Sequence, residues 1–362
     1  MSDLLPSASP VSDQRAPLTA VADDLDAINR FYRDKRWSDG LPIVPPTIER
    51  VERMLAHAGR PRDEVVALLA PGFGAATVER IAINAVMAGC DAQAMPVMIA
   101  ATEALAAPEF NLQALQTTTN PVAVWVVLNG PLARQLEFNA TFNCLGEGAW
   151  SNATVGRAVR LLLRNVGGAL PGEMDRATQG QPGHYSFCCA ENEAQSPWEA
   201  LHLERGFGVG DSTVTVVAAE GTMNMNSHSK DADELMRLIA ESMVHPPSNE
   251  YTHGGEPWLM LGPEHADILR RGGYSKAAVK ERLWELSKMP AGRMGARDLE
   301  RTRAARREEL GDIAPDTLLP IAHRASNICI IVAGGPGTHS VYVPCFGNSR
   351  ATTRVIQLPI PA

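Results

Sequence analysis

Short apolar runs alternate with helical patterns along most of the chain, and this alternation constrains the fold more than any other feature. Continuous apolar runs predict buried strands, and apolar residues recurring every three to four positions predict amphipathic helices. The predicted strands span residues 65–70, 122–128, 185–189, 212–219, 258–261 and 327–333. The predicted helices span residues 25–37, 47–56, 77–89, 94–106, 155–166, 232–244, 263–271 and 275–310, the last broken near Pro290. Strands that alternate with helices predict an α/β fold with mixed or largely parallel sheets and covering helices.

The length of 362 residues is enough for two lobes of this kind. Residues 1–20 are rich in Ser, Pro, Ala and Asp and are expected to form a flexible arm. We expect one α/β lobe over residues 21–170 and a second over residues 171–362, with the boundary in the segment 167–183, which is rich in glycine and proline.

Charge and apolar content exclude several classes of protein. The net charge of −8 and the pI near 5.6 give no long-range attraction to nucleic acid or to anionic lipid. No run approaches the ~18 apolar residues of a membrane span, and the N-terminus lacks the pattern of a secretion signal. The six cysteines are scattered without a C-x-x-C pair, so they are expected to be reduced thiols. We therefore expect a cytoplasmic protein that binds neither nucleic acid nor membrane.

A stretch of small and polar residues, 141–152, precedes a helix whose arginines share one face. Arg157 and Arg160 are three residues apart on that helix and can grip a carboxylate or phosphate in a bidentate manner. Asn152 at the end of the polar stretch and Asn129 after the first strong strand are predicted to help bind the substrate. The alternatives are a solvated helix face with surface ion pairs and asparagines that only make turns.

Thiols and carboxylates follow one another near the end of the strand at 185–189. Cys188 and Cys189 close the strand, and Glu191 and Glu193 lie in the loop after it, where α/β sheets commonly bind their ligands. Because side chains alternate along a strand, at most one of the two thiols faces this loop. We predict Cys188 as a reactive thiol and the two glutamates as proton-transfer groups. The alternative is that either cysteine is a small apolar core residue.

Imidazole groups occur beside two other predicted strand ends. His228 lies in a polar loop after the strand at 212–219 and is predicted to transfer protons. His339 and Ser340 follow the glycine-rich segment 334–337 and are predicted to line the substrate cleft, with turn stabilisation as the alternative. This glycine pattern does not match a nucleotide-binding fingerprint, so neither NAD nor ATP is indicated and the cofactor is unknown.

No paired metal-ligand motif is present in the sequence, so no residue is assigned to a metal. A metal site could still assemble in three dimensions from side chains that are distant along the chain. The residues that could contribute to it are His184, His202, His228, Glu191 and Glu193.

Several short motifs resemble those of a bacterial protein family without an assigned activity. The resemblance spans most of residues 37–345 and includes the segments 39–42, 45–47, 84–90, 152–154, 180–183, 186–188, 191–193, 196–198 and 334–337. In sequence these include DGLP, NAVMAGC, GQPG and ENE. The resemblance implies an association with partner proteins that carry a Cys/selenocysteine-Gly-Ser-Cys motif, and hence thiol or selenol chemistry. It implies no substrate and no established catalytic residue.

These patterns together predict an enzyme that acts on a small polar or anionic molecule and forms a homo-oligomer. The arginines would bind the substrate, Cys188 would supply thiol chemistry, and His228 with Glu191 or Glu193 would transfer protons. One alternative is a metal-dependent hydrolase or lyase that uses His and Glu ligands. Another is a non-catalytic accessory subunit that docks a partner through its proline-rich segment and its long charged helix.

Overall fold

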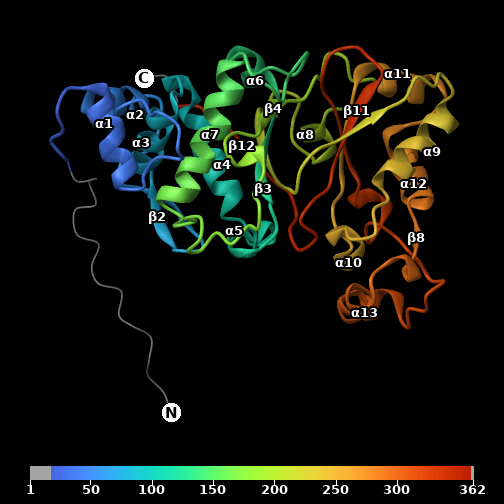
Figure 1. Cartoon of the computed structure of the whole chain (residues 1–362). Helices are drawn as coiled ribbons and strands as arrows, with labels where there is room; N and C mark the ends of the chain where they lie inside the picture. The colour runs from blue at the N-terminus through green and yellow to red at the C-terminus, as the bar shows by residue number, and fades with distance from the viewer. Residues whose placement is uncertain (1–17, 360–362) are drawn as a thin grey trace.

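A computed structural model describes residues 18–359 and shows two four-stranded sheets that face each other, with helices on their outer sides (Figure 1). The strands pair both in parallel and antiparallel, which confirms the predicted α/β class with mixed sheets. Apart from residues 18–20, the arm predicted at residues 1–20 lies outside the described residues.

The first sheet has the strand order β12-β5-β3-β4. Strands β3 and β4 are parallel, whereas β5 is antiparallel to both of its neighbours, β3 and β12. Helices α4 and α7 pack against the outer face of this sheet, and α3 packs against α7 and α4 (Figure 1). The bounds are β3 Ala123–Asn129, β4 Cys188–Ala190, β5 Thr213–Ala219, β12 Thr352–Val355, α3 Val78–Ala88, α4 Met95–Leu105 and α7 Trp150–Asn165.

The second sheet has the order β10-β7-β11-β6 and repeats the same pattern of directions. Strands β10 and β7 are parallel, and β11 is antiparallel to both β7 and β6. Helices α9, α11 and α12 contribute buried residues to its outer core. The bounds are β6 Met223–Asn226, β7 Trp258–Leu261, β10 Cys329–Val332, β11 His339–Val343, α9 Ala232–Met243, α11 Pro263–Arg271 and α12 Lys276–Leu286.

Alternation along the strands separates three apolar cores. In β3, Val126 points to the helices of the first sheet, whereas Trp125 and Val127 point to the second sheet. In β7, Trp258 points back toward the first sheet, and the rings of Trp125 and Trp258 meet edge to face at 5.6 Å. The successive layers are therefore helices, sheet, sheet and helices. One apolar core lies between each two neighbouring layers.

The chain crosses between the two sheets twice. After β5 in the first sheet it continues into β6, which pairs with β11 in the second. After β11 it continues into β12, which pairs with β5 in the first. Near the crossing point, Ala219 and Cys345 form an antiparallel bridge. The chain thus crosses between the sheets twice, and strands on both sides of residue 171 pair in the first sheet. The boundary predicted there does not coincide with the division between the sheets.

The remaining elements lie around this framework. An extended, proline-containing segment, residues 41–46, connects the neighbourhoods of the two N-terminal helices, and a small hairpin of β1 and β2 follows. A second small pair, β8 with β9, lies beside the charged helix α13. The bounds are α1 Leu25–Asp34, α2 Ile48–Leu55, β1 Val65–Leu69, β2 Gly74–Thr77, α5 Leu112–Thr117, α6 Pro131–Gln135, α8 Leu201–Glu204, α10 Asn249–His253, β8 Met289–Pro290, α13 Ala296–Leu310 and β9 Leu318–Leu319.

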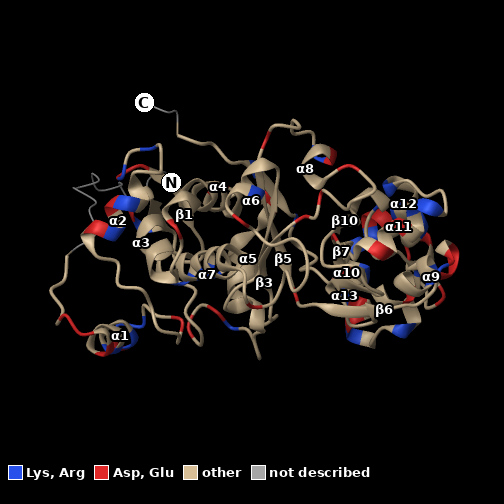
Figure 2. Cartoon of the chain, turned by 90° about the horizontal axis from the view of Figure 1, so that it is seen from above, with Lys and Arg blue, Asp and Glu red and all other residues tan. Residues whose placement is uncertain are grey.

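Charged side chains concentrate on α9, α11, α12 and α13, whose ribbons carry many blue and red segments in Figure 2. The helix predicted over residues 275–310 is interrupted between α12 and α13, as proline and glycine at 290–292 led us to expect. Within residues 18–359, no helix combines the length and apolar character needed to cross a bilayer.

Candidate functional site

Polar side chains converge where β3 and β4 end, next to the short helix α8. Asn129 is the last residue of β3, Glu191 and Glu193 follow β4, and His202 lies in α8. Because β3 and β4 are parallel, their carboxyl ends lie at the same edge of the sheet, which brings these residues together. We call Asn129, Glu191, Glu193 and His202 the strand-end cluster.

The Asn129 amide joins the two carboxylates. Its Nδ2 donates to Glu191 Oε2 at 2.6 Å and to Glu193 Oε1 at 3.1 Å. The backbone N–H of Leu201 also donates to Glu191 Oε2, at 2.8 Å, and that of Gly130 donates to Glu193 Oε1, at 2.6 Å. Backbone and amide donors therefore fix the orientation of both carboxyl groups.

Gly130 is required for this geometry. Its φ of +87° lies in the left-handed region, and a Cβ atom there would come within 2.2 Å of the Asp211 carbonyl oxygen. Only glycine lets the turn after β3 approach this backbone and direct its N–H at Glu193. The sequence segment Asn129-Gly130-Pro131 indicated a turn but not this close approach.

Four buried polar atoms of the cluster have no hydrogen-bond partner within the described residues: Asn129 Oδ1, Glu191 Oε1, and both ring nitrogens of His202. Asn129 and His202 are 1% and 2% exposed. His202 Nδ1 is 3.7 Å from Glu193 Oε1, which is longer than a hydrogen bond. Buried polar groups without partners destabilise a fold, so several in one place point to a bound polar molecule.

Burial raises the pKa of Glu191 above its usual value, and Lys276 and the hydrogen-bond donors oppose this shift. Glu193 is less buried, and Arg134 Nη1 lies 3.4 Å from its Oε2. The Arg134 side chain is 69% exposed and so marks the solvent side of the cluster. Two carboxyl groups in different environments beside an imidazole suit acid–base chemistry.

Cys188, predicted as the reactive thiol, lies on the opposite face of β4 from the cluster. It is buried in the core beneath α7, and this burial raises the pKa of its thiol well above the usual range. Strand alternation instead places Cys189 and Glu191 on the face that looks toward the second sheet. The structure therefore places Cys188 apart from the strand-end cluster, and Cys189 is the thiol on the face that looks toward the second sheet.

The predicted substrate-binding arginines already have carboxylate partners. Arg157 binds Asp39 through Nε at 2.8 Å and Nη2 at 2.9 Å, and Arg160 Nη2 binds Asp175 at 2.7 Å. Asn152 is also engaged, because its side chain bonds backbone groups of Asn139 and Cys144. These residues hold the segments around α7 in place and lie outside the strand-end cluster.

His228, His339 and Ser340 belong to the second sheet and do not join the cluster. His228 is exposed, and the exposed His339 bonds Asn224 across the pairing of β6 with β11. Ser340 is buried and bonds the backbone N–H of Gly262 and the imidazole of His265. The segments at Asn129 and Glu191 meet in the cluster, and the segment after β10 touches the one after β4, because the Asn192 N–H donates to the Val332 carbonyl oxygen at 2.7 Å. None of His228, His339 and Ser340 bonds a residue of the cluster in the described part of the chain.

Sequence reasoning considered His202 as a proton shuttle, as a residue that bonds a loop carbonyl or as a metal ligand, but did not assign it to the site, and it missed Arg134. Their sequence signal is weak, because an isolated histidine or arginine on a short helix is common. Among residues 18–359, no group of three or more His, Cys, Asp or Glu residues has the arrangement of a metal site. His184, one of the ligands considered, bonds the Val122 carbonyl oxygen instead.

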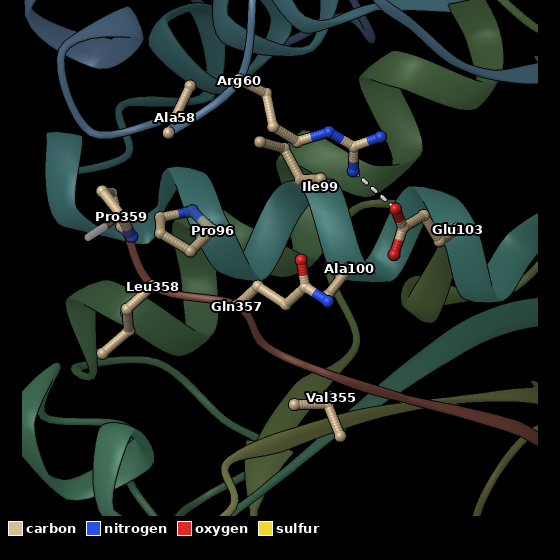
Figure 3. Close-up of a pocket in the computed structure, with 11 residues that line it drawn as sticks. Ala58, Arg60, Pro96, Ile99, Ala100, Glu103, Val355, Gln357, Leu358 and Pro359 are labelled. Carbon is tan, nitrogen blue, oxygen red and sulfur yellow. Dashed lines mark hydrogen bonds and ion pairs between the residues drawn. The ribbon is translucent and has the colours of Figure 1, made fainter.

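A separate hollow of about 190 Å³ lies between α4 and the C-terminal segment 355–359 (Figure 3). Arg60 borders it and is paired with Glu103 and Glu64, so its charge is already balanced. None of the predicted site residues lines this hollow.

Comparisons of the chain with protein families, with curated proteins and with solved structures return no match.

Proposed function

We propose that this protein is a cytoplasmic enzyme that transfers protons to and from a small anionic molecule at the strand-end cluster. The observation that carries the proposal is the convergence of unpartnered buried polar atoms from Asn129, Glu191 and His202. These atoms offer the Asn129 oxygen as an acceptor, the Glu191 oxygen as an acceptor or, when protonated, a donor, and an imidazole that can act as either.

Each residue has a distinct part in this proposal. Glu191 is the acid–base group, because its burial favours the protonated form and one of its oxygens has no hydrogen-bond partner among residues 18–359. Asn129 orients the carboxylates, and His202 with Glu193 passes the proton toward solvent. Arg134 attracts the negative charge of the substrate at the exposed side.

Deuterium exchange tests the proposal without knowledge of the natural substrate. The purified protein is incubated in D₂O with a panel of 2-oxo, 2-hydroxy and 2-amino acids, and deuterium on carbon is measured by mass spectrometry. We expect exchange into at least one compound, and a loss on the order of 100-fold in Glu191→Gln, as for removal of a general acid or base.

Glu199→Gln is the matched control, because it removes the same charge from an exposed side chain in the loop that precedes α8. It is expected to leave exchange unchanged. Exchange no faster than in buffer for every compound, or equal rates in the wild type and Glu191→Gln, would contradict the proposal.

A further inference from the structure

A buried threonine lies directly beside the strand-end cluster. Thr213 begins β5 and pairs with Asn129 at the end of β3 in the antiparallel register. Leu128 and Val214, the neighbours of these two residues, both belong to the core beneath the helices, so Asn129 and Thr213 point the other way, toward the second sheet. Residues that face each other in this manner have Cβ atoms about 4.5–5.5 Å apart. The Thr213 hydroxyl is therefore a neighbour of the Asn129 amide.

The Thr213 hydroxyl differs from those of the other buried threonines in this sheet. Thr215 lies two residues further along the same face, and its hydroxyl bonds that of Thr353 at 2.8 Å. Thr352 Oγ1 donates to the Ala104 carbonyl oxygen at 2.7 Å. Thr213 is 0% exposed, yet its Oγ1 has no hydrogen-bond partner in the described part of the chain. It therefore adds a fifth unpaired polar atom to the four of the cluster.

The hydrogen bonds already made determine what each unpaired atom can offer a ligand. Asn129 Oδ1 can only accept, because the amide donates through Nδ2 to Glu191 and Glu193. Glu191 Oε2 accepts from this amide and from the Leu201 N–H, so the proton of a neutral Glu191 lies on Oε1, which then donates. The Thr213 hydroxyl can donate or accept. The complementary group must therefore donate one hydrogen bond and accept others.

Burial limits that group further. Asn129 and Thr213 are 1% and 0% exposed, whereas the side chains of Glu193 and Arg134 are 19% and 69% exposed. A carboxylate of the ligand can thus stay beside Arg134 near solvent, while only a small group reaches the buried atoms. An ammonium group is charged and costly to bury, and a 2-oxo group has no proton for the Asn129 oxygen. A hydroxyl group is small and uncharged, and it both donates and accepts.

We propose that the strand-end cluster selects a hydroxy acid, whose hydroxyl bonds Asn129 and Thr213 and whose carboxylate faces Arg134. This inference rests on the proposed function, which places a small anionic molecule here, and it narrows three classes of acid to one. The hydroxyl donates to Asn129 Oδ1 and accepts from the Thr213 hydroxyl and from Glu191 Oε1. Thr213 is thus a specificity-determining residue, which the sequence analysis did not single out.

Equilibrium binding to the full-length protein, measured by titration calorimetry, tests the proposal. Lactate, pyruvate and alanine form a three-carbon series, and 2-hydroxyglutarate, 2-oxoglutarate and glutamate form a five-carbon series. Both enantiomers of each chiral compound are used. In at least one series we expect the hydroxy acid to bind at least about tenfold more tightly than its oxo and amino counterparts, because these leave buried polar groups unpaired or bury a charge.

The Thr213→Val variant removes the hydroxyl and keeps the shape of the side chain. We expect it to weaken binding of the hydroxy acid by about tenfold and that of the oxo acid by less than about twofold. Thr215→Val is the matched control on the same strand and face, and it is expected to keep the wild-type affinities. In denaturant unfolding only Thr215→Val is expected to be less stable than the wild type, because only its hydroxyl has a partner in the described part of the chain.

Equal affinities for the three classes of acid in both series would overturn the proposal and would mean that the buried atoms bond only water. An unchanged preference in Thr213→Val would also overturn it. If that variant fails to fold, the preference of the wild type still decides. Deuterium exchange without a preference for hydroxy acids would support the proposed function and contradict this inference. Selective binding of a hydroxy acid without exchange would do the reverse.

Discussion

At the scale of single residues, the number of partners distinguishes two buried carboxyl groups. Glu250 is completely buried, and both of its oxygens are bonded, one by the Tyr342 hydroxyl and one by the Cys345 N–H. Glu191 is buried as well, but its Oε1 has no hydrogen-bond partner among residues 18–359. Glu250 thus has the bonding of a structural group, whereas Glu191 keeps an oxygen available for a ligand.

Glu250 predicts how stability depends on pH. Burial, opposed by its hydrogen bonds, raises the pKa of Glu250 to about 8 in the folded protein, so the folded state holds this proton more tightly than the unfolded state. Its contribution to stability is present below the ordinary glutamate pKa and is lost as pH rises through about 8. We expect the free energy of unfolding to fall by up to about 1.4 kcal/mol per pH unit in this window.

Denaturant unfolding from pH 5 to pH 9 checks this expectation. The Glu250→Gln variant, which cannot ionise, is expected to show a smaller pH dependence than the wild type. The same slope in both proteins would show that Glu250 does not carry the effect.

At the scale of elements, one ion pair holds the proline-rich segment against helix α7. Asp39 precedes this segment and binds Arg157 of α7 in a bidentate manner, and Arg157 Nη2 also donates to the Pro42 carbonyl oxygen at 2.8 Å. The side chains of Arg157 and Asp39 are 14% and 6% exposed. This contact is shielded from solvent, so it is expected to be stronger than a surface ion pair.

A double-mutant cycle with Asp39→Ala and Arg157→Met measures this contact. We expect a coupling free energy of about 1–3 kcal/mol for unfolding. The control pair is Arg36 with Glu173, whose side chains are 50% and 55% exposed, and its coupling is expected to be about 0–1 kcal/mol. Equal coupling in the two cycles would mean that Arg157 does not anchor the segment.

Sequence patterns located most of the regular elements, because their signals are local. Thr47 and Thr77 cap α2 and α3 as their positions predicted, and the segment 122–128 forms most of β3. The strand at 65–69 was found but is not fully buried, since Leu68 is 58% exposed in a hairpin. Short edge strands such as β6 and β12 gave no clear pattern, because pairing with a distant strand determines them.

The candidate site was only partly predictable for the same reason. Asn129, Glu191 and Glu193 follow adjacent parallel strands, so a local reading combined with a general rule for α/β sheets identified them. The partners of Arg157 and Arg160 lie at residues 39 and 175, and nothing in the helix pattern revealed that these arginines were already neutralised. The choice between Cys188 and Cys189 depended on which face of β4 looks toward the second sheet.

At the scale of the whole molecule, the return of the chain to the first sheet makes that sheet depend on a distant segment. Strand β12, near the end of the chain, completes the edge of the first sheet. Thr352 Oγ1 in β12 donates to the Ala104 carbonyl oxygen at 2.7 Å, and the Thr353 and Thr215 hydroxyls bond at 2.8 Å. The first sheet therefore cannot be completed until this segment is in place.

A truncation tests this dependence. A chain that ends at Gly347 lacks β12 and is expected to be digested by protease much faster than the full chain, with protection restored by a peptide spanning residues 348–362. A chain that ends at Leu358 keeps β12 and serves as the control. Equal protection of the chain ending at Gly347 and the full chain would show that β12 contributes little to folding.

The central claim is that the strand-end cluster serves chemistry rather than stability. The free energy of unfolding of the His202→Leu variant tests this claim most directly. Both ring nitrogens of His202 are buried without a hydrogen-bond partner in the described part of the chain. An apolar side chain of similar size removes these unpaired groups, so we predict an increase in stability of about 1–2 kcal/mol. A decrease of that size would contradict the claim, because it would show that the imidazole stabilises the fold.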